Sequence, residues 1–301
     1  MFSRFLDCFR PQDETNKIVD RKKLIKSESS GVADQKKLIR SESRSESSGV
    51  ADHGYSMIMA SSYIPKERKS RPLGEDAHFL CQENSTFGLA DGVGGWFKKG
   101  IDSGEYARQL MNNSLMLILN QEAKGAVNLK RVLQKAFSMT KSKGSSTALI
   151  VTLKDHSLYA LNVGDCGFML YRDNQCVFRS PSQQRHFNIP YQLGNSKSSD
   201  GPSIAKEIVV PVRLGDIVVA GTDGLFDNVF EYEIEAVLRA TTNDDDKSCV
   251  GELAVIIAEY ASAKSCDKSF ESPFSKASKL AGGKHLGGKI DDVSVIVAKI
   301  I

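Results

Sequence analysis

The chain of 301 residues is long enough for one large domain or two small ones, and its 40 basic and 37 acidic residues give a formal net charge of +3. This balance favours neither nucleic acid nor an anionic membrane surface as a partner. The six cysteines are scattered without a CxxC pair, which argues against a structural zinc site and a disulfide framework and favours a reducing compartment.

The N-terminal stretch MFSRFLDCFRPQDE does not resemble a targeting segment. It lacks the continuous apolar core and the small-residue cleavage site of a secretory signal, and no run of eighteen apolar residues occurs anywhere in the sequence. Asp7, Asp13 and Glu14 are unusual for a transit peptide, which is poor in acidic residues. We therefore expect a cytoplasmic or nuclear protein, with import into an organelle left open.

Residues 1–52 contain an internal duplication, because KKLIKSESSGVAD at 22–34 returns as KKLIRSESRSESSGVAD at 36–52. Two copies are too few and too polar for a solenoid. Each copy offers little to bury against an ordering cost of about 1–2 kcal/mol per residue. We predict a flexible tail over 1–52, in which the SES pieces serve as a solvated linker or as phosphate acceptors, and a folded domain over 53–301.

The first elements of that domain are strands followed by a pair of helices. Residues 76–81 alternate between two faces, as a half-buried strand does, and the apolar run 87–90 is typical of a short buried strand. Asp102 and Glu105 form a helix-start pattern ahead of apolar residues at helical spacing. The predicted elements are strands at 55–63, 76–81 and 87–90 and helices at 103–122 and 128–141.

The second half of the chain alternates short strands with separate helices. An Asp-Asn pair at 173 and 174 predicts a hairpin turn, and residues 181–203 are expected to form an irregular polar loop. The predicted strands are 147–153, 158–163, 167–171, 177–180, 208–212, 217–221 and 293–301, and the predicted helices are 231–240 and 249–264. This order indicates an α+β fold of antiparallel sheets covered by helices.

Acidic residues recur where apolar strands meet turns. The four places are Glu75-Asp76, Asp91-Gly92, Asp223-Gly224 and Asp291-Asp292. Any one alone is typical of a turn, but two carboxylates about 4 Å apart repel by about 4 kcal/mol at an effective dielectric near 20, so four such sites brought together need cations. Oxygen-only ligands suit Mg²⁺ and Mn²⁺. Two ions bridged by Asp91 would hold a hydroxide and clamp a phosphoryl group.

At these residues the chain resembles the metal-dependent protein phosphatase family, the type 2C serine/threonine phosphatases, in its plant-like branch. The motifs that carry the resemblance are RPLGEDAHF (71–79), LADGVGGW (89–96), GSSTALIV (144–151), NVGDCGFML (162–170), AGTDGLFDN (220–228) and GGKIDDVSVIV (287–297). The resemblance covers 54–301. It implies two stacked antiparallel β-sheets flanked by helices, an α-β-β-α sandwich with the metal site at the edge between the sheets. It also implies phosphoprotein substrates, and we expect a monomer with no nucleic-acid or membrane partner.

The resemblance also implies roles for single residues. Asp91 would bridge two Mg²⁺ or Mn²⁺ ions, with the carbonyl of Gly92 on the second ion. The other implied ligands are Asp223 and Asp291 on the first ion, Glu75 and Asp76 through water or directly, and Asp165 and Asp227 on a third, weaker ion. Arg71 would contact the substrate phosphate, a task that suits a guanidinium, or it is a surface charge. The implied catalytic residues are thus Asp91, Asp76 and Arg71.

One position departs from the family pattern. Many relatives carry a histidine where this chain has Val93, and that histidine is a proposed general acid. His78 is a candidate substitute, although a histidine that only orients Asp76 is the simpler interpretation. Gly94 and Gly95 are expected to permit close backbone approach, and Trp96 is expected to pack as core.

Two other functions remain open. A relative without catalytic activity could bind phosphoproteins as an adaptor, although Asp91, Asp223 and Asp291 are all present. The segment from Gly283 to Lys289 approaches the spacing of a nucleotide-binding loop, but Ile290 replaces its Ser or Thr and a strand is predicted to follow.

Overall fold

The computed structural model describes residues 54–66, 73–120, 127–196, 199–241 and 246–301, and the side chains of 246–249 are not described. The predicted flexible tail over 1–52 therefore lies outside the described residues. The fold described below is that of the unit His53–Ile301.

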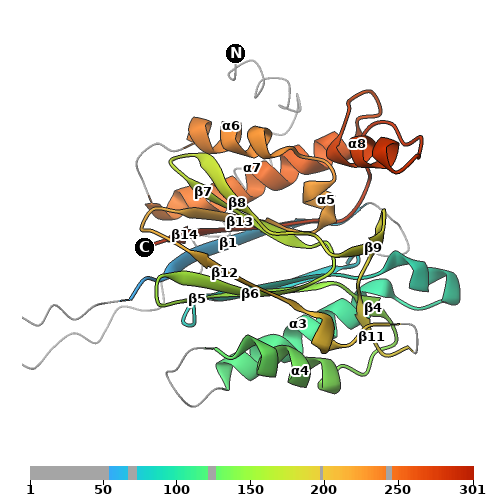
Figure 1. Ribbon diagram of the computed structural model, residues 1–301, viewed down its shortest axis with the longest axis horizontal. Coiled ribbons are helices and arrows are strands. Elements are labelled where there is room, and N and C mark those ends of the chain that lie inside the picture. Colours follow the sequence, from blue (N-terminus) through green and yellow to red (C-terminus); the bar gives the residue numbers. More distant parts are fainter. Residues whose placement is uncertain (1–53, 67–72, 121–126, 197–198, 242–245) are drawn as a thin grey trace, which may run out of the picture. The chain divides into compact units, whose positions relative to one another are not determined.

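Two five-stranded antiparallel sheets form the centre of this unit (Figure 1). The first has the order β1 (Met57–Ile64), β14 (Val293–Ile300), β13 (Ile217–Gly221), β7 (Gly167–Arg172) and β8 (Gln175–Arg179). The second has the order β12 (Lys206–Pro211), β6 (Ser157–Val163), β5 (Ala148–Lys154), β3 (Thr86–Asp91) and β2 (Asp76–Cys81). Chain neighbours such as β2 and β3 or β7 and β8 are joined as hairpins.

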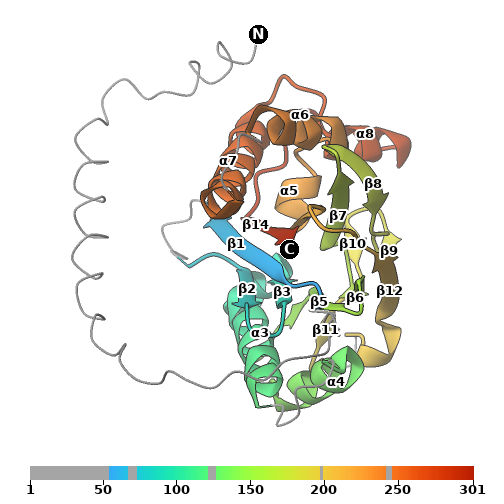
Figure 2. The ribbon, with the colours of Figure 1, turned by 90° about the vertical axis from the view of Figure 1, so that its left-hand side faces the viewer.

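Helices cover the outer face of each sheet (Figures 1 and 2). The longer helices are α3 (Ser103–Leu119) and α4 (Leu129–Met139) on the second sheet, and α6 (Glu231–Thr241) and α7 (Asp246–Cys266) on the first. The shorter elements are η1 (Gly94–Lys99), η2 (Pro202–Ile204), α5 (Asp223–Phe226), α8 (Pro273–Leu280) and the strand pairs β4 (Ser145–Ser146) with β11 (Leu193–Gly194) and β9 (Gln184–His186) with β10 (Ile189–Pro190). Among the described helices, none is both long and apolar enough to cross a lipid bilayer.

The core consists of three hydrophobic clusters, one between the two sheets and one between each sheet and its helices, because each sheet buries both faces. Leu89, Val151 and Val218 belong to the cluster between the two sheets. Leu110 of α3 packs with one outer face and Leu253 of α7 with the other. This four-layer arrangement confirms the α+β sandwich expected from the sequence.

Most predicted elements are present, with differences at their ends. Asp173 and Asn174 form the predicted turn with φ of +52° and +59°, and Asp102 caps α3 by accepting a hydrogen bond from Gly104 N at 3.0 Å. The prediction of an irregular loop over 181–203 is wrong in part, because β9, β10, β11 and η2 lie there. Strands of two or three residues are too short to show an alternating pattern. The helices α5 and α8 were not predicted.

Candidate functional site

The ends of four strands bring the predicted acidic residues to one region. Asp76 opens β2 and Asp91 ends β3, and the two are direct partners across these strands. Asp223 follows β13 and Asp291 precedes β14, and these two strands are neighbours in the other sheet. The fold thus brings acidic residues from both sheets to one end.

Asp76 is held by hydroxyl groups of the opposite sheet. The hydroxyls of Thr222 and Ser294 donate to Asp76 Oδ2 at 2.9 and 2.8 Å. Its side chain is only 4% exposed, so burial raises its pKa well above the usual range, and the carboxylates of Asp292 and Asp291 raise it further. Asp76 is therefore a fixed carboxylate in a strongly anionic environment.

Four other carboxylates act on Asp91. Burial raises its pKa well above the usual range, and the carboxylates of Asp223, Asp76, Asp291 and Asp165 act in the same direction. Its backbone is fixed in turn, since Asp91 N donates to the hydroxyl of Thr147 at 2.9 Å. Such repulsion makes the region a strong attractor of cations.

Asp165 and Asp227 extend the cluster beside Asp223. Burial raises the pKa of Asp165 to about 7, with Asp223 as the next cause, and burial together with Asp223 raises that of Asp227 to about 7 although Lys289 opposes it. Gln184 Nε2 donates to Asp165 Oδ2 at 3.0 Å. The second oxygen, Oδ1, is buried and has no hydrogen-bond partner among the described residues.

Two lysine ammonium groups lie among these carboxylates. Lys289 Nζ contacts Asp223 Oδ2, lies 2.7 Å from Asp227 Oδ2 and 3.3 Å from Asp291 Oδ2. Burial lowers the pKa of Lys289, but these three carboxylates outweigh that effect and hold it well above its ordinary value.

Lys66 is the second of these cations. Its Nζ lies 2.6 Å from Glu75 Oε2 and 2.6 Å from Asp291 Oδ1. Burial raises the pKa of Asp291, but Lys289 and Lys66 together bring it below the ordinary range. Asp291 thus links the two ammonium groups through its two oxygens.

The carboxylates do not already surround a common point. No group of three or more histidine, cysteine, aspartate or glutamate side chains in the described part of the chain is placed so that it could hold a metal ion. The ammonium groups of Lys66 and Lys289 account for this arrangement, because each draws carboxylate oxygens to itself. A cation that bound here would have to displace them.

The donor set nevertheless fits a hard divalent cation. All its side-chain donors are carboxylate oxygens, which Mg²⁺ and Mn²⁺ prefer. Asp165 Oδ1 is a buried acceptor without a partner among the described residues. The ammonium groups of Lys66 and Lys289 already lie between carboxylates, which shows that this region accommodates positive charge.

Gly92 requires the absence of a side chain. A Cβ there would collide with the backbone carbonyls of Ser103 and Glu75, while Gly92 N donates to Glu75 O at 3.1 Å. The expected close approach also holds for Gly94, which lies against the Glu75 carboxylate, but it is wrong for Gly95, which faces open space.

Asp292 belongs to one of the four acidic places of the sequence but was given no ligand role, and it holds the backbone next to the cluster. It is 1% exposed, its Oδ1 accepts from Lys66 N at 2.9 Å, and its Oδ2 accepts from Glu75 N at 3.1 Å. Asp292 thereby fixes the backbone at Lys66 and at Glu75.

The structure places His78 and Trp96 differently from the sequence-based expectations. His78 Nε2 bonds to Ser61 Oγ at 2.9 Å, and the bonds to the Asp76 carboxylate come from Thr222 and Ser294, so the interpretation that His78 orients Asp76 is wrong. Trp96 is half-buried in η1, where no residue is fully buried. Its Nε1 donates to Ser145 Oγ at 2.6 Å, so Trp96 lies over a polar network and not in the core.

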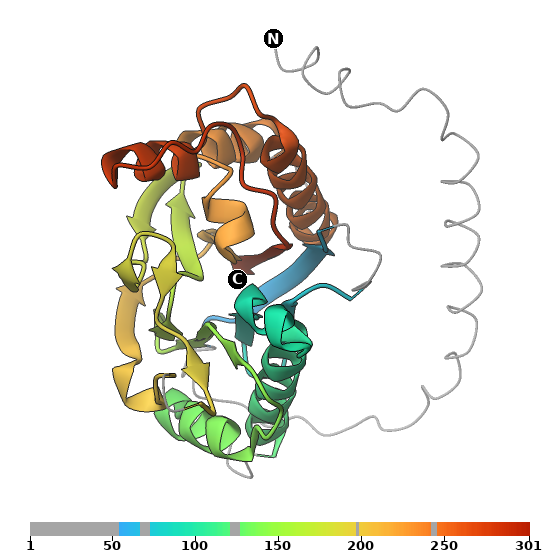
Figure 3. The ribbon, with the colours of Figure 1, turned by 90° about the vertical axis from the view of Figure 1, so that its right-hand side faces the viewer.

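Arg71, the predicted phosphate-contacting residue, lies outside the described residues. The segment 283–289 is followed by the strand β14 and not by a helix, and the Lys289 side chain is held by carboxylates. Figure 3 shows this segment running from α8 past α5 to β14. These features argue against a nucleotide-binding loop there.

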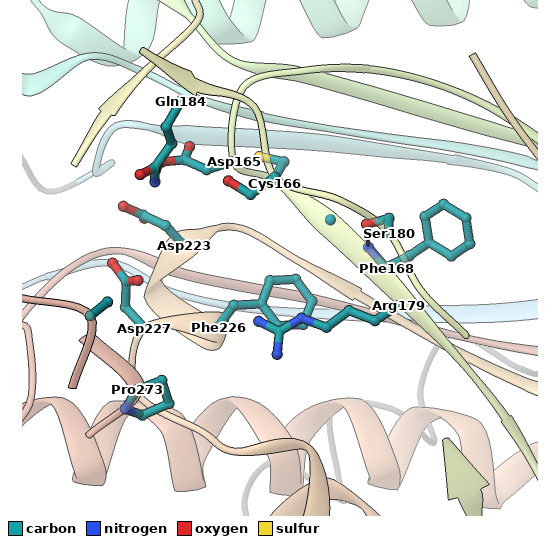
Figure 4. Close-up of a pocket in the computed structure, with 13 residues that line it drawn as sticks. Asp165, Cys166, Phe168, Arg179, Ser180, Gln184, Asp223, Phe226, Asp227 and Pro273 are labelled. Carbon is teal, nitrogen blue, oxygen red and sulfur yellow. Dashed lines mark hydrogen bonds between the residues drawn. The ribbon is translucent and has the colours of Figure 1, made fainter. Parts of the chain in front are cut away.

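A pocket of about 260 Å³ adjoins the acidic cluster. Asp165, Asp223 and Asp227 lie on one side of it, and Phe226 and Arg179 lie further along (Figure 4). The cluster is therefore reached from a cavity of side-chain size.

Relatives of the chain are phosphatases by name. It is 44% identical over 246 residues to "Probable protein phosphatase 2C 55" of Arabidopsis thaliana, and the matched region covers 81% of this chain and 52% of the relative. It is 36% identical over 251 residues to "Probable protein phosphatase 2C 26" of the same plant, covering 79% of this chain and 82% of the relative. The chain spans about half the length of the first of these relatives. No family model matches it.

Solved structures share the fold. The X-ray structure of the photosystem II phosphatase PBCP has a TM-score of 0.74 and 32% identity, over 81% of this chain and 99% of that chain. The catalytic domain of the serine threonine protein phosphatase PstP, in complex with 2 manganese ions, has a TM-score of 0.57 at 18% identity over 82% of this chain and 99% of that chain, a likeness of fold alone. The chain belongs to the protein phosphatase 2C family.

Proposed function

We propose that this chain is a protein serine/threonine phosphatase that removes phosphoryl groups from phosphoserine and phosphothreonine in proteins. The observation that carries the proposal is the gathering of Asp76, Asp91, Asp165, Asp223 and Asp291 from two sheets into one electrostatically coupled cluster. Family membership supports it. The substrates are phosphoproteins and the chain acts as a monomer in this proposal.

The cluster is proposed to hold two Mg²⁺ or Mn²⁺ ions. Asp91 would contact both, the carbonyl of Gly92 the second, and Asp223 and Asp291 the first. Glu75 and Asp76 would complete these shells, and Asp165 with Asp227 would bind a third, weaker ion. When bound, the ions would lower the pKa of a water nucleophile and offset the charge of the phosphoryl group.

The chain's own residues then have separate tasks. Thr222 and Ser294 orient Asp76, and Asp292 fixes the backbone at Glu75. Without ions, the ammonium groups of Lys66 and Lys289 hold the carboxylates in place, a role that bound ions would take over. Arg71 is proposed to contact the phosphate.

Protonation of the leaving group cannot follow the family pattern, because Val93 stands where many relatives carry a histidine. Val93 cannot donate a proton, and burial lowers the pKa of His78, which keeps its ring neutral near pH 7. Aryl phosphates, whose leaving groups need little protonation, should therefore be turned over more readily than alkyl phosphates. This feature also favours the second candidate, a weakly active or inactive relative that binds phosphoproteins.

Hydrolysis of an aryl phosphate with and without added Mn²⁺ tests the proposal. We expect Mn²⁺-dependent turnover by the wild type and its loss in Asp91→Asn and Asp223→Asn, which keep the side-chain shape but remove the charge. Asp173→Asn is the matched control, because Asp173 lies in an exposed turn with positive φ that asparagine adopts. Wild-type turnover in either cluster variant would remove the metal assignment.

The same assay separates the two candidates. A protein that binds phosphopeptides without any Mn²⁺-dependent hydrolysis would be the phosphoprotein-binding relative.

As for the compartment, we propose the cytoplasm or nucleus. The name of the relative PBCP, a photosystem II phosphatase, makes an organelle the second candidate.

A further inference from the structure

The pocket beside the acidic cluster has walls of two kinds. Its volume of about 260 Å³ lies just below the roughly 300–1,000 Å³ typical of small-molecule sites, so it suits one or two side chains better than a nucleotide. One side is formed by carboxylates of the cluster, and the rest by the start of β7, the end of β8, the loop that follows it, α5 and the start of α8.

The floor of the pocket is closely packed. Ser180 is buried and its Oγ accepts a hydrogen bond from Phe168 N at 2.9 Å. Gly167 lies beside it, where a Cβ would come within 2.8 Å of Ser180 Oγ and 3.5 Å of the Phe226 ring. The backbone of Gly167 thus lies close to both Ser180 and the Phe226 ring, with no room for a side chain between them.

Arg179 is the cationic residue of this pocket. Its guanidinium carbon lies 5.8 Å from the centroid of the Phe226 ring, and Figure 4 shows the group beside that ring. Arg179 is exposed, and within the described part of the chain no carboxylate lies at ion-pair distance from it, whereas Arg172 on the same hairpin is paired with Asp216 at 2.7 Å. The guanidinium is therefore supported on one face and has N–H groups available for a ligand.

We propose that this pocket binds an acidic side chain next to the phosphorylated residue of the substrate, and that Arg179 recognises its carboxylate. The inference rests on the proposed function. The phosphoryl group lies at the carboxylate side of the pocket, where the ions bind, and the neighbouring residue of the substrate extends toward Arg179. A carboxylate suits this position because a planar guanidinium pairs with it through two parallel hydrogen bonds.

The charge of the two walls supports this orientation. Asp165, Asp223 and Asp227 would repel an acidic side chain from the other side of the pocket, so only the phosphoryl group, attracted by bound ions, can occupy that side. The second cationic pocket near the cluster, lined by Val93, Trp96, Lys99 and Ser145, is the alternative place for an acidic residue. There Lys99 Nζ lies 4.5 Å from the centroid of the Trp96 ring.

The test uses the full chain with Mn²⁺ and a set of phosphothreonine peptides that differ only by Glu, Gln or Lys at one position, scanned over three residues on each side. We expect the wild type to prefer Glu at one or two of these positions by about threefold to tenfold in kcat/KM. Arg179→Gln should remove the preference, and Arg179→Glu should reverse it in favour of Lys at the same position. In 0.5 M salt, roughly halving the Debye length of physiological buffer, the preference should shrink.

Three controls make the result specific. Turnover of p-nitrophenyl phosphate, which has no neighbouring residue, gives the reference rate of each variant, and the loss of the Glu preference in both Arg179 variants should exceed any change in that rate. Arg131→Gln, an exposed arginine on α4, and Lys99→Gln should both keep the preference for Glu. The proposal is overturned if the wild type shows no preference, if Arg179→Gln retains it, or if the preference depends on Lys99.

Failure of this inference can be told apart from failure of the proposed function. If the wild type hydrolyses neither p-nitrophenyl phosphate nor any peptide, the proposed function fails. In that case, fluorescence anisotropy of the labelled Glu and Gln peptides still measures whether Arg179 contributes to binding. Equal affinities for the two peptides would then overturn the inference as well, and a Glu preference lost in Arg179→Gln would support the pocket as a binding site.

Discussion

Asp76 and Asp91 face each other as direct partners at one end of the antiparallel strands β2 and β3. Asp76 is fixed from outside its own sheet, because the hydroxyls of Thr222 and Ser294 donate to its Oδ2. The position of this carboxylate therefore depends on contact between the two sheets.

Thr222→Val should weaken Mn²⁺ binding about tenfold or more, because groups that orient a metal ligand typically contribute that much to affinity. The variant keeps the side-chain shape and loses the hydrogen bond to Asp76, which should lower the free energy of unfolding by about 1 kcal/mol. Isothermal titration calorimetry measures the first effect and urea unfolding the second.

Thr152→Val is the matched control for this prediction. Its hydroxyl lies 2.7 Å from that of Thr86 in a buried pair between β3 and β5. This variant should lose a similar amount of stability and keep wild-type affinity for Mn²⁺. Equal Mn²⁺ affinities in the Thr222 and Thr152 variants would show that Thr222 has only a structural role.

Lys289→Met should make the metal-free protein less stable and its response to Mn²⁺ larger. Without the ammonium group, the carboxylates of Asp223 and Asp227 lose their counter-ion and Asp291 keeps only Lys66, at a cost of about 3–5 kcal/mol. For a domain of this size that is equivalent to a fall in Tm of roughly 6–20 °C. Differential scanning fluorimetry with EDTA and with Mn²⁺ measures both effects.

Lys130→Met controls for the loss of a lysine. Lys130 and its partner Glu207 are 66% and 59% exposed, so this ion pair contributes little to stability. Its Tm should stay close to that of the wild type in both conditions. If Lys289→Met behaves in the same way as Lys130→Met, the ammonium group of Lys289 does not hold the cluster together.

Gly92→Ala should destabilise the protein by about 1–3 kcal/mol, because the new Cβ would overlap the carbonyls of Ser103 and Glu75 and the backbone must shift. Gly95→Ala, three residues on, meets no atom within 4 Å and should be nearly neutral. Urea unfolding of both variants gives the comparison. Equal midpoints would mean that the backbone at Gly92 adapts without strain.

Deletion of residues 1–52 should leave turnover of an aryl phosphate within a few fold, since the sequence predicts that this segment does not contribute to the core. Deletion of residues 1–65 should prevent folding, because it removes β1, which pairs with β14 along its whole length. Solubility and Mn²⁺-dependent turnover of the two truncations are the measurements. Loss of turnover in the shorter deletion would give the duplicated segment a part in the site.

The fold could be predicted where the sequence pattern is local. The alternation over 76–81 gave the strand β2 with its observed bounds, and Asp173-Asn174 specified a turn that needs positive φ. The helix α8 was missed although Ser272 and Pro273 form a typical start signal, in which Ser272 Oγ accepts from Ser275 N at 2.9 Å. With only four residues, α5 offers no periodicity to detect.

The site could be predicted less completely than the fold. Asp76 and Asp91 were identified because aspartates at strand ends stand out in the sequence. Lys66 and Lys289 were not, because which lysine reaches a distant carboxylate depends on the path of segments 64–66 and 281–289 in space. For the same reason, Thr222 could not be assigned to Asp76, which lies 146 residues earlier in the chain.

Calorimetric titration of Mn²⁺ into the metal-free full chain tests the central claim most directly. The account predicts that the wild type binds about two ions per chain, and that Asp91→Asn loses this binding while Asp173→Asn keeps it. Absence of Mn²⁺ binding by the wild type, or unchanged binding by Asp91→Asn, would contradict the proposal that these carboxylates form a metal centre.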